Sequence, residues 1–152
     1  MIFVTVGTTD FDDLVREMDR LAPELNERIV AQIGRGRYEP RRMEFFRFAD
    51  SLEPQYSKAA VVVSHGGLGT LIEVIERGLK LIGVSNPDRY DRHQEDILGI
   101  LSERKHMVWC RSLDRLKEAF DDLARVDLVP YRKPECRIAE RIREFLDLPG
   151  DP

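Results

Sequence analysis

AVVVSHGGLGTLIEVIERG, residues 60–78, contains the strand, the glycine-rich turn and the helix that decide the fold of this chain. The run Ala60–Val63 is apolar without alternation, which is typical of a parallel strand buried on both faces. The stretch Gly67–Arg77 carries apolar residues at helical spacing, and Gly78 is placed to end that helix. A buried strand that runs directly into a helix predicts one unit of a parallel α/β sheet.

The same alternation of short apolar runs and helix-period segments extends in both directions from this stretch. Further strands are predicted at Ile2–Val6, Arg28–Ile33, Met43–Phe48, Leu79–Val84 and His106–Cys110. Helices are predicted from a cap at Thr9 or Asp10 to a stop at Pro23, and then at Ser51–Lys58, Arg92–Arg104, Ser112–Leu123 (with Ser112 as cap) and Pro134–Leu146. We therefore expect an α/β fold, a Rossmann-like parallel sheet of about six strands flanked by helices and joined by right-handed crossovers.

Length and composition limit the class of protein. A chain of 152 residues fits one domain, 1–152, and a formal net charge of -4 argues against a nucleic-acid partner. The two cysteines, Cys110 and Cys136, form no CxxC pattern, which fits a reducing compartment. No apolar run reaches the ~18 residues that a bilayer span needs, so we expect a soluble, cytoplasmic protein.

Arginines gather in one short segment, at positions 35, 37, 41 and 42. Such a loop could meet phosphates or an acidic partner, because guanidinium groups bind oxyanions well. Runs of charge are more often simply exposed to water. On the sequence we favour a solvated turn for this segment.

The glycine-rich turn is the sharpest candidate for a ligand site. Ligands of open parallel sheets bind at the carboxyl ends of the strands, and the free N–H groups of a helix N-terminus favour a phosphate there. Thr70 adds a hydroxyl and His65 a further donor, while Glu73 stands one turn along and could accept two ribose hydroxyls. The alternative is a tight turn followed by a solvated glutamate. The motif is neither a Walker A loop nor a complete GxGxxG fingerprint, and no GxSxG elbow supports a hydrolase.

Several motifs together resemble a known family. They are Ser64-His65-Gly66-Gly67-Leu68-Gly69-Thr70-Leu71-Ile72-Glu73, Ile82-Gly83-Val84, His93-Gln94 and the opening Phe3-Val4-Thr5-Val6-Gly7-Thr8-Thr9 with Phe11. This set resembles the C-terminal domain of glycosyltransferase family 28, and within that family the small soluble subunits of two-part UDP-sugar transferases. The resemblance covers Met1 to about Arg104 and fades beyond. It implies that the chain is equivalent to the C-terminal, donor-binding half of a GT-B fold.

The resemblance also implies a role for individual residues. Glu73 would hold the ribose, and His93 and Gln94 would contact hydroxyls of the transferred sugar. The backbone around Phe48 and Ala49 would meet the uracil. The residues implied at the donor site as a whole are Thr8, Thr9, His65, Gly66, Gly67, Gly69, Thr70, Glu73, His93 and Gln94. His65 is a candidate catalytic base, although it also faces the phosphates, and a base on a partner subunit is the other option.

The function implied is an inverting transfer of GlcNAc or glucuronate from UDP to a lipid-linked acceptor. The acceptor domain would come from a membrane-anchored partner subunit, so that the chain is cytoplasmic and peripheral to the membrane, and the helix at about 134–147 could dock on that partner or pack on its own sheet. No DxD-like motif is present, so we expect no essential metal and no cofactor beyond the UDP-sugar donor. Two alternatives are a non-catalytic nucleotide-sugar-binding module and a flavodoxin-like receiver domain, which Asp10, Asp12 and Asp13 imitate faintly.

Overall fold

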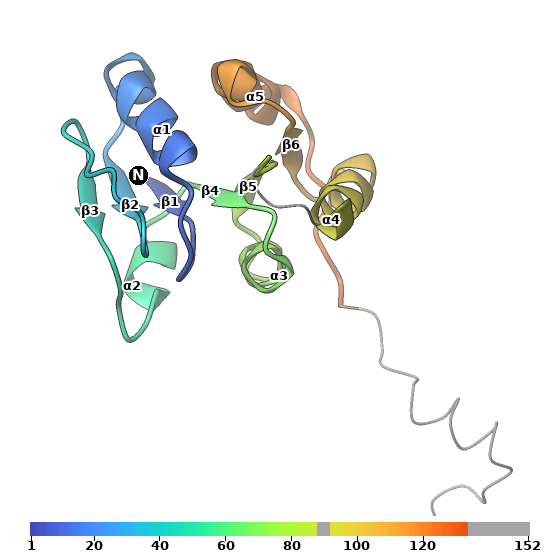
Figure 1. The fold of residues 1–152 in the computed structure, drawn as a ribbon. Coiled ribbons are helices and arrows are strands. Elements are labelled where there is room, and N and C mark those ends of the chain that lie inside the picture. The colour runs from blue at the N-terminus through green and yellow to red at the C-terminus, as the bar shows by residue number, and fades with distance from the viewer. Residues whose placement is uncertain (88–91, 134–152) are drawn as a thin grey trace, which may run out of the picture.

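The computed structural model describes residues 1–87 and 92–133, which form one sheet between two layers of helices (Figure 1). The strands are β1 (Ile2–Thr5), β2 (Ile29–Gln32), β3 (Glu44–Phe46), β4 (Val61–His65), β5 (Lys80–Val84) and β6 (Val108–Cys110). The helices are α1 (Asp12–Leu25), α2 (Glu53–Tyr56), α3 (Leu68–Glu76), α4 (Arg92–Glu103) and α5 (Leu116–Arg125), the last preceded by a 3-10 turn at Leu113–Arg115. The predicted α/β class is confirmed.

The six strands run in the order β3-β2-β1-β4-β5-β6, and every pair is parallel. This is the strand order of the dinucleotide-binding Rossmann fold, in which the chain reverses direction across the sheet between β1 and β4. The register places Thr5, the last residue of β1, beside Ser64 of β4 and Gln32 of β2. The loops that follow β1 and β4 therefore leave the sheet side by side.

Each face of the sheet has its own helices and its own core (Figure 1). Helices α1 and α5 cover one face, and α2, α3 and α4 cover the other. Alternation along β1 serves both cores, because Val4 packs toward α1 and α5 while Phe3 packs toward the other layer. There the Phe3 ring stacks on Phe46 with centroids 6.3 Å apart and meets Tyr56 edge-on at 5.6 Å. Both faces of the central strands are therefore buried, as their unbroken apolar runs predicted.

The N-cap predicted for the first helix is wrong. Phe11 takes the N-cap position and no side chain caps α1, so neither Thr9 nor Asp10 has that role. The Thr9 hydroxyl instead donates to the carbonyl of Val6 at 2.8 Å, which folds the loop back on the end of β1. The helix start is set by burial, since Phe11 is only 4% exposed.

Two other predicted boundary signals also differ from the structure. Pro23 lies inside α1, which continues to Leu25 and ends on a left-handed Asn26. Pro23 has no N–H to donate to the carbonyl four residues earlier, yet the helix continues past it to Leu25. Ser112 precedes a 3-10 turn and makes no side-chain cap, because its hydroxyl donates to the Asp114 carboxylate instead.

One predicted helix falls in a segment that the structure does not describe. The helix Pro134–Leu146 and its docking role lie outside the described residues. Within the described part, no helix has both the length and the apolar character that a bilayer span requires.

Candidate functional site

The connection from β4 to α3 places His65 directly against Gly67. His65 is the last residue of β4 rather than a loop residue, and it is only 8% exposed. The Gly67 N–H donates to the His65 carbonyl at 2.8 Å. A Cβ atom built on Gly67 would lie 2.9 Å from His65 Nε2, so a side chain at this position would collide with the ring. The glycine allows the imidazole to lie against the backbone that enters α3.

The N-terminus of α3 has the properties of an anion site. Gly67 occupies the N-cap position, and within the described chain no side chain caps the helix. The first-turn N–H groups of a nine-residue helix then carry a partial positive charge and need an external acceptor. Thr70 is half-buried in this turn, and a Cβ atom built on Gly69 would meet nothing within 4 Å. Among the described residues, none fills the space beside Gly69.

The loop after β1 reaches the same place. A Cβ atom built on Gly7 would lie 3.6 Å from His65 Cε1. Thr8 is exposed, whereas the Thr9 hydroxyl is bonded to the backbone of its own loop. Of the two predicted ligand threonines, Thr8 therefore presents its side chain to solvent, and Thr9 shapes the loop.

The predicted His93-Gln94 motif lies in the first turn of α4. A Cβ atom built on Gly66 would lie 3.0 Å from the Gln94 Cβ and 3.3 Å from its Oε1. Gln94 thus stands in the first turn of α4 directly over the glycine turn. The His93 side chain lies outside the described part of the structure. Segments around Gly7, Gly66 and Gln94, distant in the sequence, come together at the carboxyl edge of β1 and β4.

Glu73 belongs to a small network between α2 and α3. One carboxylate oxygen accepts a hydrogen bond from the Tyr56 hydroxyl at 3.4 Å, and the other lies 3.2 Å from an Arg77 nitrogen. Arg77 also pairs with Glu53 at 2.7 Å and lies over the Tyr56 ring, 4.9 Å from its centroid. Glu73 itself is exposed, so its orientation is set from one side while the carboxylate stays accessible.

Tyr56 is the donor in this network. Burial, together with the nearby Glu73 charge, raises the pKa of Tyr56 to about 12. The hydroxyl therefore keeps its proton at physiological pH and can donate to the carboxylate.

Two members of this network were missed in the sequence. Arg77 stands four residues after Glu73, a spacing at which side chains meet on a helix, so this ion pair could have been predicted. Tyr56 falls within the predicted helix Ser51–Lys58. Its contact with Glu73 depends on how α2 packs against α3, for which the sequence carries no local signal.

The remaining predicted residues lie at the same edge of the sheet. β3 ends at Phe46, so Phe48 and Ala49 lie in the loop after it, and both are exposed. Phe48 is 56% exposed and Leu68, at the start of α3, is 52% exposed. Large apolar side chains that stay uncovered at a binding edge are available to a ligand or a partner. Among residues 1–87 and 92–133, no group of His, Cys, Asp and Glu is arranged to hold a metal ion.

Comparison with known proteins identifies the family of the chain. The model of the glycosyltransferase family 28 C-terminal domain matches residues 1–148. Over 122 residues the chain is 33% identical to the UDP-N-acetylglucosamine transferase subunit ALG13 of Homo sapiens, a match that covers 72% of this chain and 11% of that protein. The chain therefore spans only a small part of this relative's length.

Solved structures show the same fold. An NMR structure of ALG13 superposes with a TM-score of 0.63 at 18% identity and covers 93% of each chain. The glycotransferase of kitacinnamycin superposes with a TM-score of 0.62 at 21% identity, covering 81% of this chain and 34% of that one. The structural neighbours are GT-B glycosyltransferases, so the expected likeness to one half of a GT-B fold is confirmed.

Proposed function

The chain belongs to the glycosyltransferase family 28 C-terminal domain family, and from this premise we propose that it is the donor-binding, catalytic subunit of an inverting UDP-sugar transferase. The observation that carries the proposal is the meeting of three segments, through Gly7, Gly66 and Gln94, at the N-terminus of α3, which no described side chain caps. Glu73 stands one turn further along that helix. This arrangement suits a nucleoside diphosphate, which has phosphates for the helix and ribose hydroxyls for a carboxylate.

The chemistry follows from where charge develops. As the acceptor hydroxyl attacks the anomeric carbon, the diphosphate leaves with increasing negative charge. Fixed N–H groups at the start of α3, with Thr70 and His65 beside them, are already oriented toward that charge and stabilise it without reorganising. We propose that the exposed Glu73, oriented by Tyr56 and Arg77, accepts the ribose hydroxyls.

Substrates and partners extend the proposal beyond this half of the enzyme. The donor is UDP-GlcNAc or UDP-glucuronate, and the acceptor is a lipid-linked sugar. A membrane-anchored subunit supplies the acceptor domain and holds the chain, 1–152, at the cytoplasmic face of the membrane. Because His65 lies against Gly67 beside the phosphate position, we place the base that deprotonates the acceptor on that subunit, with His65 as the alternative. We propose that no metal is needed, so transfer should persist in a chelator.

Calorimetric titration of the chain with UDP, UDP-GlcNAc and UDP-glucuronate tests the donor site. Replacing Glu73→Ala removes a charged acceptor and should weaken UDP binding by about tenfold or more. Glu76→Ala is the matched control, since it lies on the same helix and pairs only loosely with Lys133 at 3.8 Å. Equal UDP affinities of the Glu73→Ala and Glu76→Ala variants would contradict the proposed role of Glu73. Transfer assays with and without the partner subunit then separate a catalytic subunit from a non-catalytic binding module.

A further inference from the structure

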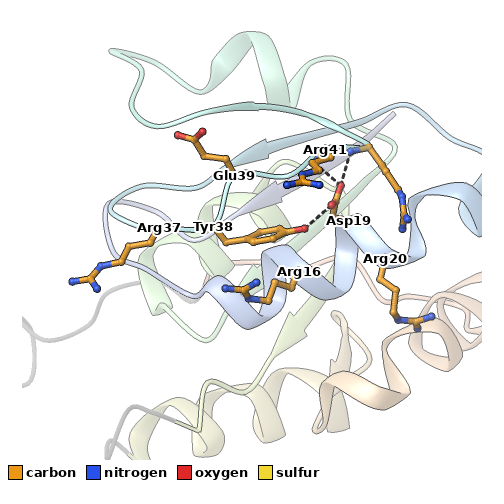
Figure 2. Close-up of a pocket in the computed structure, with 8 residues that line it drawn as sticks. Arg16, Asp19, Arg20, Arg37, Tyr38, Glu39 and Arg41 are labelled. Atoms are coloured by element: carbon orange, nitrogen blue, oxygen red, sulfur yellow. Dashed lines mark hydrogen bonds between the residues drawn. The ribbon is translucent and has the colours of Figure 1, made fainter.

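A second hollow lies between α1 and the loop from β2 to β3, and arginines dominate its lining (Figure 2). Its volume is about 520 Å³, within the range of small-molecule sites. Five arginines line it together with Tyr38: Arg16, Arg20, Arg37, Arg41 and Arg42. Arg16 and Arg20 come from α1 and the others from the loop, so the hollow exists only because the loop folds along the helix.

Buried and half-buried carboxylates of α1 hold the loop in place by its backbone. Asp19, 5% exposed, accepts hydrogen bonds from the Tyr38 hydroxyl at 2.6 Å and from the N–H groups of Arg41 and Arg42 at 3.0 and 2.6 Å. Asp12 accepts from the Arg37 N–H at 3.0 Å. Figure 2 shows the three bonds converging on Asp19. The carboxylates are thus engaged with N–H groups and a hydroxyl, while the guanidinium groups extend from a fixed backbone.

The charge around the hollow is unbalanced. Its lining holds five guanidinium groups against two carboxylates, in a chain whose formal net charge is -4. Of the two carboxylates, Asp19 is used as described and Glu39 pairs with Arg47 at 2.8 Å. Arg20 pairs with Glu17 at 2.7 Å. The other four, at positions 16, 37, 41 and 42, form no ion pair with a carboxylate within residues 1–87 and 92–133.

Tyr38 organises the centre of this cluster. The Arg16 guanidinium lies over the Tyr38 ring, 4.3 Å from its centroid, and is held there by a cation–π contact. Figure 2 shows Arg16 beneath the ring and Arg41 beside Asp19. The only aromatic ring of the lining is therefore occupied by an arginine. The hollow offers positive charge and hydrogen-bond donors rather than an apolar wall.

We propose that this arginine pocket is a second binding site, separate from the donor site, for phosphate groups of a soluble phosphate compound or of a lipid headgroup. The planar guanidinium fork matches the geometry of phosphate oxygens, and several forks around one hollow fit a ligand with several such oxygens. Guanidinium groups also bind carboxylates, but an extended acidic peptide presents its carboxylates one by one along its length, whereas this hollow gathers its guanidinium groups around one space.

The test uses inorganic pyrophosphate as the soluble probe, titrated into the full chain and its variants, so that binding lost only in the pocket variant is assigned to this hollow. Arg16→Gln with Arg41→Gln should weaken pyrophosphate binding by about tenfold or more. Arg104→Gln with Arg125→Gln removes the same charge from exposed positions outside the pocket and should leave binding within about twofold. Thermal unfolding of each variant shows whether it is folded.

A second arm identifies the source of the phosphate. Co-sedimentation with phosphatidylcholine vesicles, with and without phosphatidic acid, is compared for the same variants. Binding of pyrophosphate or of the acidic vesicles that the pocket variant alone loses supports the proposal and names the source. Equal loss in both double variants, no binding to either probe, or binding of poly-glutamate in preference to both would overturn it. UDP titration of the same chains reports on the donor site separately, so failure of one site does not affect the test of the other.

Discussion

The carboxyl edge of β1 and β4 that we propose to bind the donor, called the donor edge, and the proposed arginine pocket would present positive charge to a ligand in opposite ways. At the donor edge the groups are backbone N–H donors at the start of α3, and glycines bring His65 and Gln94 close to them. In the arginine pocket the groups are long side chains, and the backbone that carries them is held by Asp19. Backbone N–H groups have a fixed geometry, which suits a reaction step in which negative charge develops on the ligand. The long arginine side chains carry full charges and extend away from the backbone, which suits the initial binding of a ligand.

The two regions meet at Gly34. This residue has a φ of +51°, and a Cβ atom built on it would lie 2.2 Å from the Thr9 carbonyl oxygen and 2.8 Å from that of Gly7. The next residue, Arg35, donates its N–H to the same Thr9 carbonyl at 2.9 Å. The start of the arginine loop thus lies directly against the first loop of the donor edge. Substitutions that affect one region, the other or both therefore test whether the two regions are independent.

The largest effect is expected at this junction. Gly34→Ala combines a left-handed backbone with a collision against main chain, so it should lower the free energy of unfolding by about 2–4 kcal/mol. Gly69→Ala is the control, because it lies in a helix with open space around it and should raise stability by about 0.5–1 kcal/mol. Urea unfolding measures both. A neutral Gly34→Ala would show that the two loops are not packed as described.

A smaller effect is expected at Asp19, which serves only the arginine pocket. Asp19→Asn removes the charge from three hydrogen bonds and should lower the free energy of unfolding by about 2–3 kcal/mol at neutral pH. Hydrogen exchange should rise at the Arg41 and Arg42 amides. Asp121→Asn, at an exposed position of α5, is the matched control. Unchanged UDP affinity in the Asp19 variant would confirm that the two regions are independent, and a loss would couple them.

The same carboxylate predicts a pH dependence. Burial opposes ionisation of Asp19, but the hydrogen bonds from Tyr38 and the loop backbone outweigh it, and the pKa of Asp19 lies below its usual value. A group whose pKa is lowered in the folded state contributes stability above its unfolded pKa of about 3.9 and loses it as the pH falls through the folded value. Urea midpoints measured from neutral to acid pH should therefore fall less steeply for Asp19→Asn than for the wild type. Parallel curves would contradict the assignment.

The smallest effects are expected from the two tyrosine hydroxyls. Tyr56→Phe removes the donor to Glu73 and should weaken UDP binding by about 1 kcal/mol or less, at most about fivefold, since the bond is long at 3.4 Å. Tyr38→Phe removes the donor to Asp19 and should weaken pyrophosphate binding while leaving UDP unaffected. Each variant is the control for the other. If both variants changed both affinities, the division into two sites would fail.

Much of the fold could be predicted from the sequence alone, because buried strands and helices each have a characteristic spacing of apolar residues. The unbroken run Ala60–Val63 predicted a strand covered on both faces, and the glycine turn predicted the helix that follows it. The strand order, by contrast, is a property of the crossovers. Boundary details also differed where packing replaced a local signal, as at Phe11, which starts α1 without the cap that Thr9 or Asp10 was expected to supply.

Within the site, the sequence by itself determined which residues enter the carboxyl edge, since the end of each apolar run marks where a loop begins. Only the tertiary structure decided the contacts across that edge. Gln94 over Gly66, Tyr56 against Glu73 and Asp19 beneath the arginine loop each join segments at least 17 residues apart. Such contacts depend on strand order and on the packing of helices against the sheet. The residue pattern within one segment does not indicate which distant segment will pack against it.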